Sequence, residues 1–188
     1  MLKSWLQVCE EKGCIKPSVF QGQYNLLCRS YEQSHLEFLR KHDIRFFGHS
    51  PFAGGFLSGQ LTFATDPSDL KGTRWEDSPS NAFGKAFLAC YDKPSMHAAV
   101  RKMSALCESH QVGMFEAALR WTFYHSGLVG GPILSEGGDG VVTGARNLET
   151  LRKYADAFIA GPLPEELESG LTGLWDEVKE DASPFLAW

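Results

Sequence analysis

The chain has 188 residues and a mass of 20.8 kDa, a size that suits one domain. Apolar residues make up 43% and charged residues 22%, both near globular averages, so a disordered chain, a coiled coil and a collagen-like repeat are excluded. The 18 basic and 23 acidic residues give a net charge of −5 without any run of Lys or Arg, which argues against a nucleic-acid ligand. Residues 1–188 are therefore expected to form a single domain.

Targeting signals and cysteines indicate where the protein is expected to reside. No window of about 18 apolar residues occurs, so no membrane span is predicted. Acidic residues follow Met1 too closely for a signal peptide. The histidines on expected helices lack partners at metal-ligand spacing, so no metal site is predicted. Five cysteines without C-x-x-C spacing are expected to be reduced thiols in the cytoplasm. They are Cys9, Cys14, Cys28, Cys90 and Cys107.

Helices and strands are expected to alternate in the first part of the chain. Apolar spacing from Trp5 to Cys9 predicts a helix that stops near Gly13. A strand over residues 18–21, a helix over residues 32–41 and a strand over residues 44–49 are expected to follow.

The second part of the chain is expected to be mainly helical. The polar residues 65–81 are too many for a plain connection and predict a functional loop or lid. Pro94 is expected to begin a helix, and another is expected over residues 114–125. A third strand is expected at residues 141–144. Asn147 can cap a following helix, and Pro164 is expected to open the last one.

This order of elements is typical of βα units around a parallel sheet, which predicts the α/β class. About three parallel strands are expected, and such a sheet has two open edges that are normally paired or covered. A homodimer in which a second copy closes the sheet is therefore expected.

Three segments, residues 17–25, 47–59 and 142–149, resemble the aldo-keto reductase superfamily, and its aflatoxin-aldehyde reductase branch in particular. The resemblance covers nearly the whole chain but only the C-terminal half of the family fold. It implies a half TIM-type βα barrel with about three parallel strands and five to seven helices. A complete barrel needs roughly 250 residues. The catalytic Asp, Tyr, Lys and His of the family come from its first four strands, which have no counterpart here.

The resemblance also implies a set of cofactor-facing residues. Gln21 matches the residue that hydrogen-bonds the nicotinamide carboxamide. His49 stands at the position of the aromatic ring that stacks on the nicotinamide in the family. Gln60 stands where the family usually has a Lys after the glycine-rich loop. Lys153 and Tyr154 stand where the family has the pair that clamps adenine. These departures favour a protein without a cofactor, with NADP as the alternative. The residues implied for phosphate binding are Ser50, Gly54, Gly55, Ser58, Arg146 and Asn147.

His49 and Tyr24 are the candidate catalytic residues. Imidazole titrates near neutral pH, and side chains at the carboxyl ends of barrel strands point to the ligand site. Gln21 and Asn25 are candidates for substrate binding, and so is Trp188, because the tail borders the substrate pocket in some relatives. A purely structural role, in the core or at a strand end, is the alternative for each.

Three functions are compatible with these residues. The first is non-redox acid/base chemistry, such as isomerisation, cyclisation or dehydration, on a small aromatic or polyketide-like molecule bound at the strand ends. The second is the C-terminal portion of an NADP-dependent reductase of aldehydes or ketones that needs the missing half. The third is a non-catalytic interaction protein.

Overall fold

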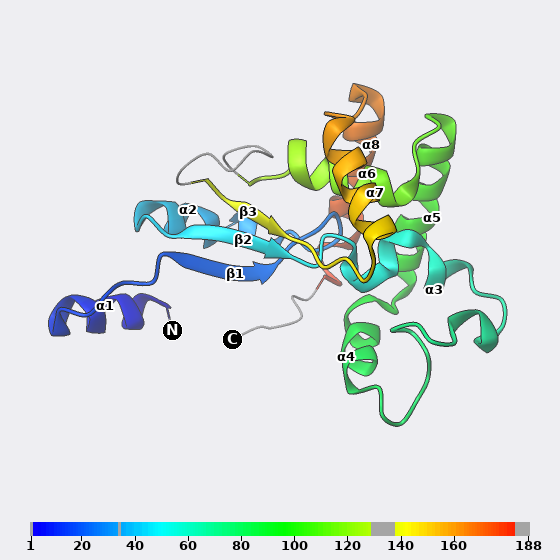
Figure 1. Ribbon diagram of the computed structural model, residues 1–188. Coiled ribbons are helices and arrows are strands. Elements are labelled where there is room, and N and C mark those ends of the chain that lie inside the picture. The colour runs from blue at the N-terminus through cyan, green and yellow to red at the C-terminus, as the bar shows by residue number, and fades with distance from the viewer. Residues whose placement is uncertain (1, 34, 129–137, 183–188) are drawn as a thin grey trace.

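The computed structural model describes residues 2–33, 35–128 and 138–182 of the chain (Figure 1). Most helices gather beyond the carboxyl ends of three strands, whereas α1 and α2 lie toward their amino ends (Figure 1). Within this part of the chain, no helix is long and apolar enough to cross a membrane.

The three expected strands form one parallel sheet in the order β1-β2-β3, which confirms the predicted α/β partial barrel. They are β1 (Val19–Gln23), β2 (Arg45–His49) and β3 (Gly140–Val142). In the sheet register, Gln21 lies beside Phe47, and Gln23 lies beside His49, which in turn lies beside Val142. All three strands therefore deliver their last residues to the same edge of the sheet.

The two faces of the sheet differ because side chains alternate along each strand. Phe46 and Gly22 face the helices, and a Cβ at Gly22 would come within 2.8 Å of the Tyr31 ring. The other face, here called the open face, carries side chains that stay exposed or half-buried, apart from Gln23, which is buried at the end of β1. It consists of Val19, Gln21, Arg45, Phe47, His49 and Val142. That a second copy of the chain covers this face stays a prediction.

The described residues hold eight α-helices, against the five to seven expected. They are α1 (Leu2–Lys12), α2 (His35–Lys41), α3 (Gln60–Phe63), α4 (Ala82–Tyr91), α5 (Pro94–Ser109), α6 (Met114–Tyr124), α7 (Leu148–Ile159) and α8 (Glu165–Val178). Three 3-10 helices connect them, namely η1 (Ser30–Gln33), η2 (Ala53–Ser58) and η3 (Pro67–Leu70).

Helix ends follow the expected capping chemistry. Pro94 stands in the first turn of α5, and the Asn147 side chain accepts a hydrogen bond of 2.8 Å from the backbone N–H of Thr150. Helix α4 was not predicted. Its start is nevertheless capped by Asn81, which accepts from the N–H of Gly84 at 2.8 Å. The helix expected over residues 32–41 is split, since η1 precedes α2.

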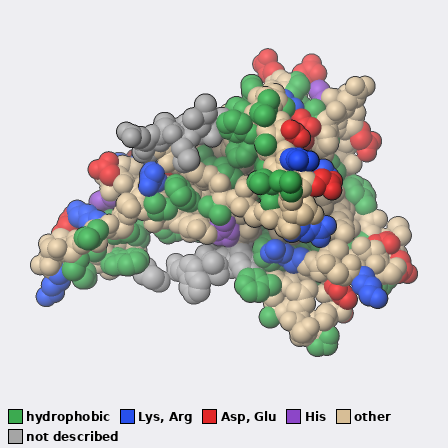
Figure 2. Space-filling view, viewed as in Figure 1, with side chains coloured by type: hydrophobic (Ala, Val, Ile, Leu, Met, Phe, Trp, Pro, Cys, Tyr) green, Lys and Arg blue, Asp and Glu red, His purple; other side chains and the backbone are tan. Residues whose placement is uncertain are grey.

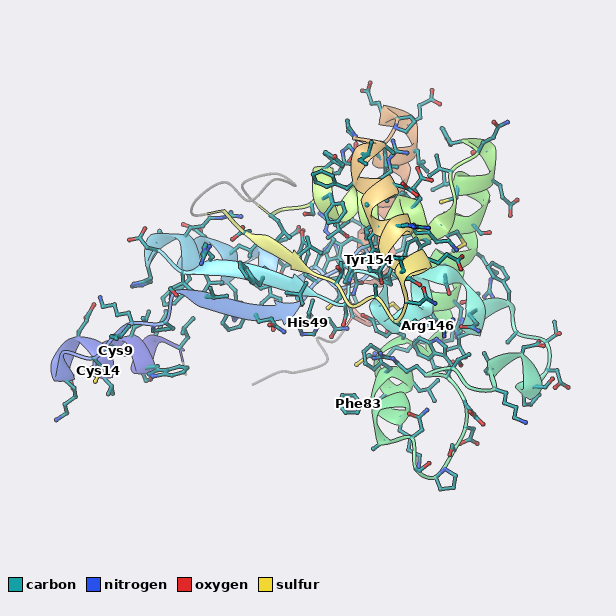
Figure 3. The ribbon with its side chains drawn as sticks, viewed as in Figure 1. Cys9, Cys14, His49, Phe83, Arg146 and Tyr154 are labelled. Carbon is teal, nitrogen blue, oxygen red and sulfur yellow. The ribbon has the colours of Figure 1, made fainter. Side chains whose placement is uncertain are left out.

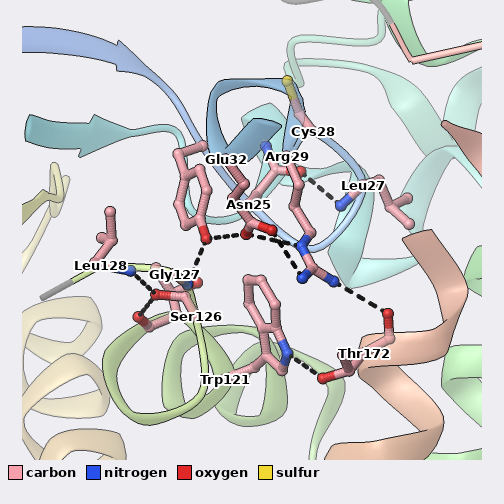
Figure 4. Close-up of polar contacts among 12 residues, drawn as sticks. Asn25, Leu27, Cys28, Arg29, Glu32, Trp121, Ser126, Gly127, Leu128 and Thr172 are labelled. Atoms are coloured by element: carbon pink, nitrogen blue, oxygen red, sulfur yellow. Dashed lines mark hydrogen bonds and ion pairs between the residues drawn. The ribbon is translucent and has the colours of Figure 1, made fainter. Parts of the chain in front are cut away.

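A polar network beneath the sheet joins the segment after β1 to α6 and α8 (Figure 4). Arg29 donates to both carboxylate oxygens of Glu32, at 2.9 and 3.0 Å, and to the backbone oxygen of Thr172 at 3.1 Å. The guanidinium also lies 5.0 Å from the centroid of the Trp121 ring. Because these groups are largely withdrawn from solvent, each one satisfies a neighbour that would otherwise be left unpaired.

Tyr24 belongs to the same network. Its hydroxyl donates to Glu32 and accepts from the backbone N–H of Gly127 at 2.8 Å. Burial, followed by the neighbouring Glu32 carboxylate, raises the pKa of Tyr24 well above its ordinary value. The phenol is therefore neutral across the physiological range and acts as a link between the strand end and the segment after α6.

We predict that Glu32→Gln lowers the free energy of unfolding by about 1–3 kcal/mol, because it removes the charge that faces Arg29. Denaturant unfolding followed by circular dichroism measures the change. Glu37→Gln is the matched control, because Glu37 is solvent-exposed and pairs with Lys41 on the surface of α2. Equal losses in the two variants would contradict a structural role for the network.

Candidate functional site

The candidate site lies at the carboxyl ends of the strands. His49 and Arg146 both lie near this edge of the sheet (Figure 3). On the side of the molecule that displays the open face, Figure 2 shows hydrophobic and basic side chains and a histidine near the middle. The edge joins three segments, namely the end of β1, the turn after β2 and the loop between β3 and α7.

The turn after β2, residues 50–59, has an unusual backbone. Five of its residues adopt left-handed φ angles: Ser50 (59°), Ala53 (53°), Gly54 (69°), Gly55 (101°) and Gly59 (80°). Glycine adopts this region freely, but Ser and Ala do so at a cost of about 1–2 kcal/mol each. Strain of this kind persists only where the surroundings impose it, and it is typical of ligand-binding segments.

Buried amides hold the turn in place. Asn25 donates to the backbone oxygen of Ser50 at 3.1 Å and to the Tyr91 hydroxyl at 3.0 Å. Gln23 donates to the same hydroxyl at 2.5 Å, and all three side chains are buried. Burial raises the pKa of Tyr91 well above its ordinary value, so this hydroxyl stays neutral. Asn25, expected to bind substrate, is thus engaged in supporting the turn.

Aromatic side chains pack against the glycines of the turn. A Cβ at Gly54 would come within 2.4 Å of the Phe87 ring, so only glycine fits there. Phe87 of α4 packs edge-on against Trp75, and the Arg74 guanidinium lies 4.4 Å from the Phe87 ring centroid. The polar segment expected over residues 65–81 therefore contributes directly to the packing below the turn.

His49 ends β2 and is half-buried. Its Nδ1 lies 3.0 Å from the Ser50 hydroxyl, and burial lowers the pKa of the imidazole below its ordinary value. The ring is therefore neutral at pH 7, the form that accepts a proton. Gln21 lies on the same face of the neighbouring strand, two pairs back in the register, and its side chain is exposed. The structure thus brings these two predicted residues to one surface.

The loop after β3 presents Arg146 to solvent. Its nearest acidic neighbour in the chain, Glu149, pairs with Lys153 at 2.9 Å. Asn147 uses its side-chain oxygen to cap α7. The Tyr154 hydroxyl donates to the backbone oxygen of Gly144 at 3.0 Å and so ties the loop to the helix.

Three stacked rings connect this loop to the turn after β2. Phe52 lies parallel to Phe115, with ring centroids 4.2 Å apart, and Tyr154 stacks at 5.5 and 5.4 Å from them. Beside the stack, a groove of about 710 Å³ runs between α6 and α7. It is lined by Gly113, Phe115, Glu116, Thr150, Lys153, Asp156, Ala157 and Ala160.

Another predicted residue, Tyr24, does not join this surface. Tyr24 is fully buried in the network described above, so its hydroxyl faces Glu32 and not the open face. Trp188 lies outside the described residues. No group of three or more potential metal ligands occurs in residues 2–33, 35–128 and 138–182.

Gln23 and Tyr91 support the site but were not predicted as part of it. The only signal for Gln23 was its alternation with Gly22 along β1, which placed it on the same face as Gln21. Tyr91 had no such signal, since it belongs to the unpredicted helix α4.

Comparison with known proteins gives a consistent match. Residues 4–175 match the model of the Aldo/keto reductase family. Oxidoreductase sirO of Leptosphaeria maculans is 39% identical, covering 93% of this chain and 50% of its own length. Aflatoxin B1 aldehyde reductase member 2 of Rattus norvegicus is 29% identical, covering 93% and 46%. Member 4 of Homo sapiens is also 29% identical, covering 89% and 50%.

The chain spans about half the length of the curated relatives it matches. The matching half contains the strand-end turn, His49 and the Arg146 loop. It therefore carries one side of the edge at which ligands bind in βα barrels.

We predict that Gly54→Ala destabilises the protein by clearly more than Gly72→Ala. Both glycines have φ near +70°, but a Cβ at Gly72 meets no atom within 4 Å, whereas at Gly54 it meets Phe87. Backbone strain alone costs about 1–2 kcal/mol. The clash with Phe87 adds to that cost in Gly54→Ala, as overpacking does. Thermal or denaturant unfolding measures both, and equal losses would show that Phe87 yields freely.

Proposed function

Because the chain belongs to the aldo/keto reductase family, we propose that it supplies the nucleotide-binding half of an NADP-dependent reductase of aldehydes or ketones. The observation that carries this proposal is the strained turn over residues 50–59, which lies at the same sheet edge as Arg146. Oxidoreductase and aldehyde reductase are the activities that the relatives' names give, and they support the same chemistry for this chain.

The residues fit the phosphate groups of a dinucleotide. A turn rich in left-handed residues can direct backbone N–H groups toward an anion. In this turn the N–H groups of Ala53, Gly55, Leu57 and Gly59 donate to backbone oxygens within it and so fix its shape. The Ser50 and Ser58 hydroxyls lie in the same turn. Gly55 leaves space beside the backbone, since a Cβ there would meet only Trp75 Nε1 at 3.6 Å. Arg146 has the planar donor set that suits a 2′-phosphate.

Each of these groups has a separate task in the proposed site. The turn and Arg146 bind phosphate, while Gln21 on the open face orients the nicotinamide carboxamide. When bound, NADPH supplies the hydride that reduces the carbonyl. Tyr154 holds the Arg146 loop through its bond to Gly144, and the stack with Phe52 keeps that loop next to the turn. The groove beside Lys153 offers space for the adenine end.

Reduction of a carbonyl also needs a proton donor. In the proposed enzyme this donor comes from strands that pair next to β1 and are not among β1, β2 and β3. Without them the present half binds nucleotide but does not turn over a carbonyl. Binding is therefore the property that tests the proposal most directly.

We expect NADPH to bind saturably, followed through quenching of the tryptophan fluorescence. Arg146→Met should raise the Kd for NADPH by about 10–100-fold while changing the Kd for NADH little, because a charged hydrogen bond to phosphate is lost. Arg152→Met, which removes an exposed arginine of α7, serves as the control. The proposal fails if the wild-type chain shows no saturable binding, or if both variants weaken NADPH equally.

His49 supports a second candidate function, non-redox acid/base chemistry on a small organic molecule. A half-buried, neutral imidazole beside a hydroxyl is suited to accept a proton from carbon next to a carbonyl. This chemistry requires no nucleotide. An aromatic ketone such as α-tetralone is a suitable probe, because its α-protons exchange with deuterium in D₂O when a base is in reach.

We predict that, for this second function, the chain catalyses that exchange without NADPH and that His49→Gln slows it by about 100-fold or more. Catalysis should fall as the pH drops through the lowered pKa of His49, because only the neutral ring accepts a proton. Proton NMR follows the exchange. An unchanged rate in His49→Gln would exclude His49 as the base, and an effect only with NADPH would favour the reductase proposal.

A further inference from the structure

Helix α1 ends in a closed turn that contains two cysteines. Gly13 adopts φ +65°, and the backbone N–H of Cys14 donates to the backbone oxygen of Cys9 at 2.9 Å. This bond spans six residues around a left-handed glycine, the arrangement known as the Schellman motif. In that motif the side chain that follows the glycine frequently contacts the helix one turn back, at the position of Cys9 or at the position before it.

Two side-chain contacts support the same fold-back. The Cys9 sulfur lies 3.7 Å from the backbone oxygen of Ile15, so it points toward the residues after the helix. Lys16 returns to pair with Glu10 at 2.7 Å. The segment after Gly13 is therefore held against the last turn of α1 by three interactions. Cys9 and Cys14 lie close together at this end of the molecule (Figure 3).

We propose that Cys9 and Cys14 form a site of reversible disulfide modification. The backbone hydrogen bond between the two residues keeps their Cα atoms within the roughly 4.4–6.8 Å that a disulfide requires. Cys14 is exposed and can meet an oxidant, whereas Cys9 is 4% exposed and acts as the resolving thiol. This inference is independent of the proposed nucleotide site.

The other three cysteines are shielded from oxidants. Cys28, Cys90 and Cys107 are buried. Burial raises the pKa of Cys28 to about 12 and that of Cys107 to about 11, so neither forms a thiolate readily near neutral pH. Burial also raises the pKa of Cys90. Oxidation should therefore concentrate at the end of α1.

The reaction is a thiol–disulfide exchange with a small oxidised disulfide such as glutathione disulfide. The Cys14 thiolate attacks one glutathione sulfur, forms a mixed disulfide and releases one glutathione thiolate. The Cys9 thiolate then attacks the Cys14 sulfur, and the second glutathione leaves. The two protons lost by the cysteines end on the two glutathione molecules. Both cysteines are thus oxidised as one glutathione disulfide is reduced.

The test is equilibration of the full chain in glutathione buffers, followed by acid quenching and double digestion with trypsin and chymotrypsin. Cleavage after Leu6, Lys12 and Phe20 separates the two cysteines, so the disulfide appears as peptide 7–12 linked to peptide 13–20. Mass spectrometry should detect this pair in the oxidised sample and lose it on reduction with dithiothreitol. Cys14 found only as a glutathione adduct, or linked between two molecules, would overturn the proposal.

Variants test whether the turn geometry is responsible. Cys14→Ser should abolish the linked pair. Gly13→Ala meets no neighbouring atom within 4 Å, so it acts only through the left-handed φ and should lower the oxidation equilibrium constant by about five-fold. Gly161→Ala, which changes a glycine of φ +74° after α7, should leave it unchanged. An equal oxidation constant in Gly13→Ala and wild type would show that the turn does not align the thiols.

Discussion

The parallel pairing of β1 with β2 is the constraint on which the candidate site depends. In a parallel sheet both strands end at the same edge, so Gln23 and His49 lie side by side although they are far apart in sequence. The Asn25 side chain then reaches the backbone of Ser50 at 3.1 Å. Without that register, the Asn25 amide would not reach the turn after β2.

At the same edge, hydrogen bonds of buried polar side chains offset the cost of strained backbone angles. Ser50 and Ala53 occupy a region of φ that disfavours both residue types. The shared Tyr91 hydroxyl and the Asn25 amide offset that cost with hydrogen bonds between buried groups. Rigid support of this kind is what a phosphate-binding turn requires, because its donors must be aligned before the ligand arrives.

Much of the architecture could be predicted from the sequence, since strand and helix periods report burial directly. Asn147 and Pro94 marked helix starts by their chemistry, and Gly13 marked a helix end. The alternation along β1 separated Gly22 from Gln21 but did not tell how deeply the following Tyr24 would lie. Tyr24 looked like a ligand group because its burial depends on Glu32 and Trp121, which arrive from other elements.

The departures from the family pattern were also visible in the sequence, but their structural meaning was not. The resemblance puts Tyr154 where the family clamps adenine, and only the structure reveals its stack with Phe52 and its bond to Gly144. The strain at Ser50 and Ala53 had no signal, because neither residue is a glycine. The roles of His49, Gln21 and Arg146 in chemistry stay predictions.

The spacing of the strands along the chain has a consequence for how the molecule assembles. β1 and β2 are about 20 residues apart, so they can pair early at a low entropic cost of loop closure. β3 follows β2 by roughly 90 residues and contributes only three residues to the ladder. We expect β3 to dock after the intervening helices have collapsed, so that the Arg146 loop takes its final position late in folding.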